Sequence, residues 1–328
     1  MKTKHSNLYQ FVFDYGHGVR KTCIPKFKGA CRRAYQRLSR NLVKKHDYTK
    51  LIKLKVGDVN LLFTASHSFP AKYLTQPLYA TNLSRLCGFL ASRLGCISVI
   101  DVGANIGDSA ALIASACDSN VLCIEGNEEY YELLTHNSSK LKGVEIELSF
   151  VGERDEQRKA SIISDGAGTT TLSYSETKNK YKTLNFRTLD SIISDHPSFN
   201  QFKVMKIDTD GYDLPILCAN IDIIKKANAV IHMEYAPSWM PDGKDSQIPF
   251  FEVLSRNQYN RCIVYTSEGD VHSEANFKNI ESIKSFHEYF CRNKRYGDIA
   301  TFSDEDEELY KSFVHLEYKH MREHFCVK

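Results

Sequence analysis

Apolar residues along the chain follow two different periods. Between residues 96 and 237, short and nearly continuous apolar runs alternate with segments whose apolar residues recur at helical spacing. Uninterrupted apolar runs are typical of strands that are buried on both faces of a parallel sheet. Their alternation with helices predicts a doubly wound, mostly parallel, Rossmann-like α/β sheet. The five runs are 96–103, 120–126, 144–153, 202–211 and 228–237.

Segments on either side of this pattern predict further elements. Residues 51–65 predict two strands around a Gly57-Asp58 turn, and leucines at helical spacing predict a helix over 81–95. A Thr- and Ser-rich excursion interrupts the alternation before residue 202. After Ser303, an acidic start and a basic end predict a capped helix. We therefore predict an N-terminal extension, a main domain and a C-terminal helix, over residues 1–50, 51–302 and 303–328.

The predicted extension is strongly basic. Residues 1–50 contain thirteen Lys and Arg residues, against Asp14 and Asp47 as the acidic ones. Within it, residues 28–45 have the spacing of a basic amphipathic helix. Three interpretations stay open: packing on the domain as a substrate lid, peripheral contact with an anionic membrane surface, and a solvated arm.

Composition narrows the class of protein. The 328 residues are 42% hydrophobic and 25% charged, which is ordinary for a soluble globular chain. A net charge of only +3 gives no argument for a nucleic-acid partner. We find no apolar stretch long enough to span a bilayer, no secretory signal, and no C-x-x-C pair among the ten cysteines. We therefore expect reduced thiols and a cytoplasmic location.

The stretch VIDVGANIGDSA, residues 99–110, places a carboxylate directly before a glycine turn. Asp101 ends an apolar run, and Gly103 and Gly107 follow as G-x-x-x-G rather than as the G-x-G-x-x-G of dinucleotide folds. An acid at this position would repel a diphosphate but suits a ligand that carries an amine, such as S-adenosylmethionine. The alternative is a turn that only lets strand and helix pack closely. We predict that Asp101, Gly103 and Gly107 bind S-adenosylmethionine.

The next two predicted strands supply further cofactor candidates. Glu125 ends the second strand, where an acid can accept hydrogen bonds from both ribose hydroxyls. Val151 ends the third strand and is placed to lie against an adenine face, beside Glu153. Glu153 could equally be an exposed loop acid.

Five blocks of the chain together resemble the FkbM-type class I methyltransferases, over roughly residues 50–302. Two departures are Gly126-Asn127 in place of the usual Glu-Pro and Asp210 where Glu is commoner. The resemblance implies methylation dependent on S-adenosylmethionine, mostly of hydroxyl groups on sugars and secondary metabolites. We also predict that Asn105 and Asn127 join the cofactor site. The blocks are VIDVGANIGDSA, VLCIEGNEEYYELLTHN, FRTLDSII, VMKIDTDGYDLPIL and VIHMEYAP.

The last two blocks carry the candidate catalytic residues. Asp208 ends the fourth strand and Glu234 ends the fifth, at the sheet edge where ligands of such folds gather. A hydroxyl acceptor must lose its proton, so we predict Asp208 as the general base and Glu234 as the second choice. The predicted partner is a glycan or a small metabolite, and no metal is needed.

Three alternatives stay open for the function of this edge. Asp208-Thr209-Asp210 spells the D-x-D of metal-dependent glycosyltransferases. Asp208, Asp210 and Glu234 could together hold a metal ion in a methyltransferase. The chain could also bind S-adenosylmethionine without catalysis, as a scaffold.

Overall fold

A computed structural model places most of the chain. The described residues are 4–5, 7–19, 25–45, 49–174, 181–240, 243–293 and 295–326. The remaining parts of the predicted extension, at 1–3, 6, 20–24 and 46–48, lie outside them.

An eight-stranded sheet forms the centre of the fold, in the order β14-β13-β15-β12-β11-β4-β5-β6. The five strands from β12 to β6 are parallel, and β15, β13 and β14 continue the sheet antiparallel. The predicted fold class is confirmed. The strands are β4 (Ile97–Val102), β5 (Ser119–Glu125), β6 (Val144–Leu148), β11 (Val204–Ile207), β12 (Val230–Tyr235), β13 (Tyr259–Thr266), β14 (Val271–Asn276) and β15 (Gly297–Ser303).

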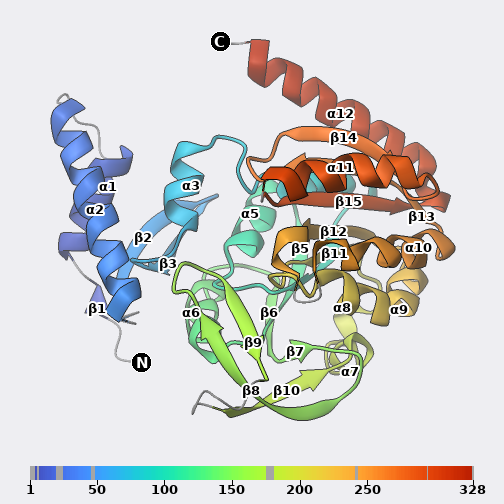
Figure 1. Ribbon diagram of the computed structural model, residues 1–328, viewed down its shortest axis with the longest axis horizontal. Coiled ribbons are helices and arrows are strands. Elements are labelled where there is room, and N and C mark those ends of the chain that lie inside the picture. Colours follow the sequence, from blue (N-terminus) through green and yellow to red (C-terminus); the bar gives the residue numbers. More distant parts are fainter. Residues whose placement is uncertain are drawn as a thin grey trace.

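Helices cover both faces of this sheet (Figure 1). Along β4, Val99 belongs to the apolar cluster of one face and Ile100 to that of the other, which explains the continuous apolar run. One cluster contains α4 (Asn82–Leu94), α5 (Asp108–Ala116), α6 (Glu128–Ser138) and α12 (Glu307–Cys326). The other contains α7 (Leu189–Asp195), α8 (Asp213–Ala219), α9 (Ile221–Lys226), α10 (Ile248–Arg256) and α11 (Ile280–Asn293).

The Thr- and Ser-rich excursion folds as a separate four-stranded sheet, in the order β7-β10-β8-β9, below the main sheet in Figure 1. The predicted strand over 144–153 is divided between β6 and β7 at the buried Ser149. The loop after β8 reaches the main domain, where the Ser68 N–H donates to the Ala167 carbonyl at 2.7 Å. The strands are β7 (Phe150–Val151), β8 (Glu156–Ser164), β9 (Thr170–Ser173) and β10 (Lys182–Arg187).

The basic extension packs against the domain rather than forming a solvated arm. Tyr35 and Leu42 are buried in one cluster with Phe63, and the Tyr35 hydroxyl donates to the Ala65 carbonyl at 2.8 Å. A cavity at the carboxyl ends of the parallel strands, described below, is lined by no described residue of 1–50, so the interpretation as a substrate lid is not supported either. The elements here are β1 (Lys4–His5), α1 (Asn7–His17), α2 (Pro25–Lys45), β2 (Lys50–Val56), β3 (Val59–Thr64) and α3 (Phe69–Thr75).

Some helices and strands differ from what the sequence predicted. After Gly211 the chain forms two short helices, α8 and α9, which are divided at Asn220. The elements α10, α11, β14 and β15 were not predicted. Among the described residues, no helix combines the length and the apolar character needed to cross a membrane. The division into three segments stays a prediction.

Candidate active site

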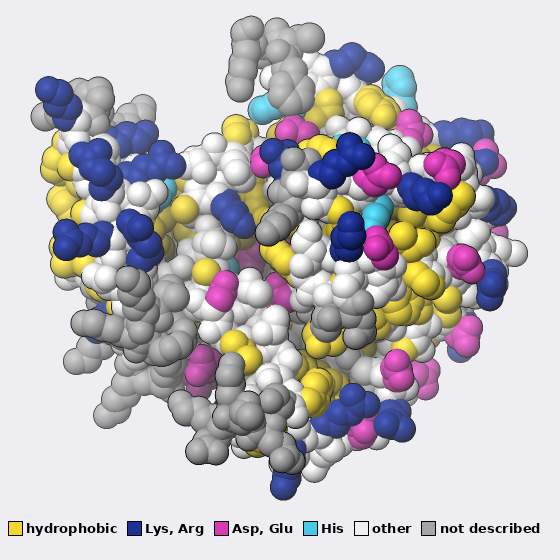
Figure 2. Space-filling model, viewed as in Figure 1, with side chains coloured by type: hydrophobic (Ala, Val, Ile, Leu, Met, Phe, Trp, Pro, Cys, Tyr) yellow, Lys and Arg dark blue, Asp and Glu magenta, His cyan; other side chains and the backbone are white. Residues whose placement is uncertain are grey.

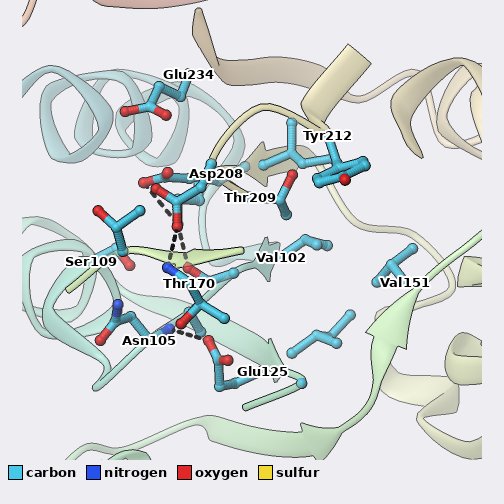
Figure 3. Close-up of a pocket in the computed structure, with 18 of the residues that line it drawn as sticks. Val102, Asn105, Ser109, Glu125, Val151, Thr170, Asp208, Thr209, Tyr212 and Glu234 are labelled. Carbon is cyan, nitrogen blue, oxygen red and sulfur yellow. Dashed lines mark hydrogen bonds and ion pairs between the residues drawn. The ribbon is translucent and has the colours of Figure 1, made fainter. Parts of the chain in front are cut away.

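A cavity of about 580 Å³ opens at the carboxyl ends of the parallel strands. It lies beyond the ends of the neighbouring strands β4 and β11, where the chain order of the sheet reverses. This is the usual ligand position in open α/β sheets. Its volume is within the range of small-molecule sites. Figure 3 shows side chains from the ends of four strands, Val102, Glu125, Asp208 and Glu234, around one space.

Gly103 brings the loop after β4 against the turn after β11. Its φ is +73°, and a Cβ on it would overlap the carbonyl oxygen of Asp208. Only glycine therefore fits this close backbone approach. Gly107, with φ +88°, caps α5 but does not itself line the cavity.

Asp101 lies beneath this loop and does not line the cavity. Its side chain is fully buried, with one carboxylate oxygen 2.8 Å from the Lys206 Nζ and the other accepting from the Ser109 hydroxyl at 2.6 Å. Burial would lower the pKa of Lys206, but Asp101 and Asp208 raise it above its ordinary value. Lys206 also donates to the Gly103 carbonyl at 2.9 Å. The charge of Asp101 is therefore already paired with Lys206, and its contact with the cofactor amine stays a prediction.

Glu125 sits inside the cavity with both oxygens oriented by backbone groups. They accept from the N–H group of Asn127 at 2.7 Å and from that of Asn105 at 2.8 Å. Figure 3 shows the hydrogen bond between Asn105 and Glu125. Burial raises the pKa of Glu125 to about 7, although these two N–H groups favour the charged form. Each oxygen keeps a lone pair for a ligand hydroxyl.

The two asparagines differ in position. Asn105 lines the cavity in the left-handed region, at φ 50°, and its amide donates to the Gly168 carbonyl at 2.7 Å. Asn127 does not line the cavity; its side chain caps α6 by accepting from the Glu129 N–H. Its side-chain oxygen therefore holds the start of the helix, and its contact with the cofactor stays a prediction.

The end of the cavity near the four-stranded sheet is apolar. Val151 is buried and lines it, while the exposed Glu153 stands at its margin. Nearby, the rings of Phe150 and Phe186 stack with their centroids 5.3 Å apart. A flat aromatic ligand group would fit against these side chains.

The opposite end is acidic. Asp208 and Asp210 lie in the turn that follows β11, and Glu234 is the penultimate residue of the strand β12. One carboxylate oxygen of each lies within 4.8 Å of the others. Burial, with help from Asp208, raises the pKa of Asp210 to about 8 and that of Glu234 well above its ordinary value. The turn is fixed by Asp213, whose carboxylate accepts from the backbone N–H groups of Thr209 and Gly211.

Several cavity residues were not predicted from the sequence. Lys72 donates to the Tyr296 hydroxyl at 2.8 Å, and Trp239 packs on Tyr296 at a centroid distance of 5.3 Å. His232 also lines the cavity. Burial lowers its pKa to about 3, and its Nε2 has no hydrogen-bond partner in the described part of the chain. Tyr296 precedes β15, which the apolar pattern did not predict, so no motif in the sequence points to it. These rings and Tyr79 form the wall beside the acidic end.

The cavity residues suit a cationic, nucleoside-containing group. The backbone around Gly103 leaves room for close approach, Glu125 offers acceptors for ribose hydroxyls, and the Val151 end is apolar. Acidic side chains at the other end favour positive charge, and a buried oxygen of Glu234 accepts no hydrogen bond from any described residue. The fold and this cavity are those expected of a class I methyltransferase that uses S-adenosylmethionine.

Comparison with known families makes the assignment specific. The Methyltransferase FkbM domain family matches residues 101–276, more than half of the chain. The chain belongs to the FkbM methyltransferase family, and its cofactor is S-adenosylmethionine. The family resemblance seen in the sequence is confirmed, and the glycosyltransferase alternative has no support from it.

Solved structures show weaker likenesses, and none of the curated proteins compared matches the chain. A precorrin-6y C5,15-methyltransferase from Geobacter metallireducens is 13% identical over 68% of this chain and 86% of its own, with a TM-score of 0.35. A SAM-dependent methyltransferase from Agrobacterium tumefaciens is 8% identical over 77% and 70%, with a TM-score of 0.42. One from Aquifex aeolicus is 11% identical over 63% and 82%, with a TM-score of 0.33. The family assignment does not depend on them.

Proposed function

We propose that the protein methylates a hydroxyl oxygen of a glycan or of a small hydroxylated metabolite. The observation that carries this proposal is the convergence of Asp208 and Glu234 beside the Gly103 loop, at the ends of adjacent strands. A hydroxyl loses its proton as its oxygen takes the methyl group, so the acceptor needs a proton acceptor within hydrogen-bond reach. Carboxylates at this edge provide one.

Different residues along the cavity would bind different parts of the cofactor and accept the proton. Glu125 would hold the ribose hydroxyls and Val151 the adenine, with Gly103 and Asn105 forming the loop between them. S-adenosylmethionine supplies, when bound, an electrophilic methyl group on a positively charged sulfur. Asp208 is our first choice as the base, because its backbone contacts the cofactor loop and its side chain is half exposed in the cavity. Proton transfer to a positioned base contributes about 10²–10⁴-fold to rate.

Aromatic side chains support a ring-shaped acceptor. Tyr79, Tyr296 and Trp239 line the cavity near the acids, and the Trp239 side chain is 44% exposed. Apolar ring faces with a few fixed polar groups are typical of small-molecule sites.

The test is turnover on a panel of hydroxylated sugars and metabolites with isotopically labelled S-adenosylmethionine. We expect labelled product with the methyl group on oxygen, located by NMR. Product methylated on nitrogen or carbon would contradict the proposal. Tight binding of S-adenosylhomocysteine without turnover on any acceptor would favour the scaffold alternative.

We also propose that the α1–α2 pair contacts an anionic membrane surface. Phe11 and Phe27 are 46% and 39% exposed, and each packs on Tyr15, at centroid distances of 4.7 and 5.5 Å. Exposed apolar residues surrounded by cations are typical of interfacial helices. Figure 2 shows basic and hydrophobic side chains sharing the surface of this part of the molecule. The exposed cations are Lys26, Lys28, Arg32, Arg33, Arg37 and Arg40.

The membrane proposal is tested by flotation with vesicles of phosphatidylglycerol and phosphatidylcholine. We expect the full chain to float with anionic vesicles, and to float less at high salt. A variant with both Phe11→Ser and Phe27→Ser should remain at the bottom of the gradient. Leu316→Ser, an exposed leucine on α12, is the matched control. Failure of the unaltered chain to float would refute it. Self-association that the double variant abolishes would show that a second copy covers this face instead.

A further inference from the structure

The acidic end of the cavity contains one carboxylate whose burial the described side chains do not explain. Glu234 is 8% exposed, and its buried Oε2 has no hydrogen-bond partner among the residues that the structure describes. Burying an unpaired carboxylate is costly, and native proteins usually satisfy such groups. In Figure 3 the Glu234 carboxylate faces the space that Asp208 borders.

Two lysines lie near these acids, but each makes its shorter contacts with other groups. Lys206 lies 2.8 Å from Asp101 and 2.9 Å from the Gly103 carbonyl, but 3.7 Å from Asp208. Lys72 donates to the Tyr296 hydroxyl. The charge of the acidic end is therefore only partly balanced by the side chains around it.

We propose that Asp208, Asp210 and Glu234 hold a divalent cation that binds the acceptor hydroxyl. Their three oxygens, all within 4.8 Å of one another, fit around a single ion. Opposite ligands on Mg²⁺ are about 4.2 Å apart and those on Ca²⁺ about 4.6–5.2 Å apart, from the usual metal–oxygen distances. A set of oxygen ligands alone selects Mg²⁺, Mn²⁺ or Ca²⁺ over softer metals.

The position of the ion gives it a role in the reaction proposed above, on which this inference rests. Three protein ligands leave coordination positions for water and for an acceptor oxygen. Coordination lowers the pKa of the hydroxyl. Its proton goes to the Asp208 oxygen that does not bind the ion, the oxygen lone pair forms the bond to carbon, and the electrons of the broken carbon–sulfur bond stay on sulfur.

Two features of the turn preset the ligands. Asp210 is held in the left-handed region at φ 54°, and its Oδ2 accepts from the Thr170 N–H at 2.8 Å. Asp213 holds the backbone of Thr209 and Gly211. The β9 strand and the turn after β11 therefore fix the two aspartates, and β12 fixes Glu234 on the other side.

The experiment measures Mn²⁺ binding directly. Full-length protein is stripped with a chelator, loaded with S-adenosylhomocysteine, and titrated with Mn²⁺ by calorimetry and by electron paramagnetic resonance of the free ion. We expect one equivalent to bind, with affinity reduced at least about tenfold in Glu234→Gln and in Asp210→Asn. Glu128→Gln, an exposed acid on α6, is the matched control and should bind Mn²⁺ as the unaltered chain does.

The outcomes separate the two proposals. S-adenosylhomocysteine binding without Mn²⁺ binding, or unchanged Mn²⁺ binding in both variants, would overturn the cation site and leave the proposed methylation standing. Mn²⁺ binding that depends on these acids, in a protein without methyl transfer to any hydroxyl, would support the site and overturn the proposed reaction. Should Glu234→Gln not fold, the more accessible Asp210→Asn decides, with thermal unfolding as the check on its integrity.

Discussion

Substitution of Glu125 by glutamine tests the ribose site most sharply. Both carboxylate oxygens accept backbone N–H groups, those of Asn105 and Asn127. A glutamine amide can replace only one oxygen, and its NH₂ group would face the other N–H, donor against donor. The orphaned N–H costs about 1–3 kcal/mol of stability, and loss of charge-assisted hydrogen bonds to the ribose costs about 1.5–3 kcal/mol of binding.

Those values translate into a measurable affinity change. At about 1.4 kcal/mol per factor of ten, S-adenosylhomocysteine should bind about 10- to 140-fold more weakly to Glu125→Gln. Calorimetry measures this, with circular dichroism to show that the variant is folded. Glu128→Gln, three residues further along and exposed, makes the same chemical change outside the cavity.

The pH dependence provides a second measurement. The ionised form of Glu125 is the acceptor, so binding favours its deprotonation and strengthens as pH rises through the raised pKa of about 7. The ionised fraction grows from about a tenth at pH 6 to about nine tenths at pH 8, which predicts about ninefold tighter binding by the unaltered protein. Asp108 and Asp298 line the same cavity with pKa values that burial raises to about 7, so only the part of the pH dependence lost in Glu125→Gln belongs to Glu125. Unaltered affinity, or an unaltered pH profile, in Glu125→Gln would refute the ribose assignment.

Three further substitutions test other parts of the site. Asp208→Asn should lower turnover about 10²–10⁴-fold with little change in S-adenosylhomocysteine affinity; full activity in this variant, with Glu234→Gln inactive, would move the base to β12. Asp101→Asn should lower the free energy of unfolding by about 3–5 kcal/mol in chemical denaturation, because it leaves Lys206 buried without its closest partner. Adding Lys206→Met should restore part of the lost stability, and additive losses of stability in the double variant would contradict the pairing. Gly103→Ala should cost about 2–5 kcal/mol, from its left-handed φ and its overlap with Asp208, and abolish cofactor binding. Gly95→Ala is its control, at a similar φ of +82° but with open space around the Cβ, so equal losses in both would show that backbone contact is unimportant.

The sequence predicted the central strands well because burial on both faces leaves a local signal. The run at 96–103 corresponds to β4, and the run at 120–126 to β5. The strand β15 is paired on both sides, with β12 and β13, but it gave no usable signal because its apolar residues form only a short run interrupted by Thr301. Tyr296 and Asp298 were missed with it.

The same difference applies within the site. Gly103 could be singled out because a glycine in a strand–helix loop reports a local backbone need. The pairing of Asp101 with Lys206 could not, because it depends on which strand lies next to β4. A motif indicates that an acidic residue is required at a position, but it does not identify the basic residue with which that acid pairs.

The Asp101–Lys206 ion pair has a consequence for how the sheet assembles. The two residues are direct partners in the parallel pairing of β4 with β11. Apart from Ser98 in β4, the other residues of both strands are apolar, so hydrophobicity alone distinguishes poorly between alternative alignments. A slip of one residue would turn one charge to the opposite face and leave two buried ions unmatched, at a cost of several kcal/mol. The pair thus selects the correct alignment during folding, and a charge-free replacement such as Asp101→Asn, Lys206→Met should keep the sheet but misassemble more often.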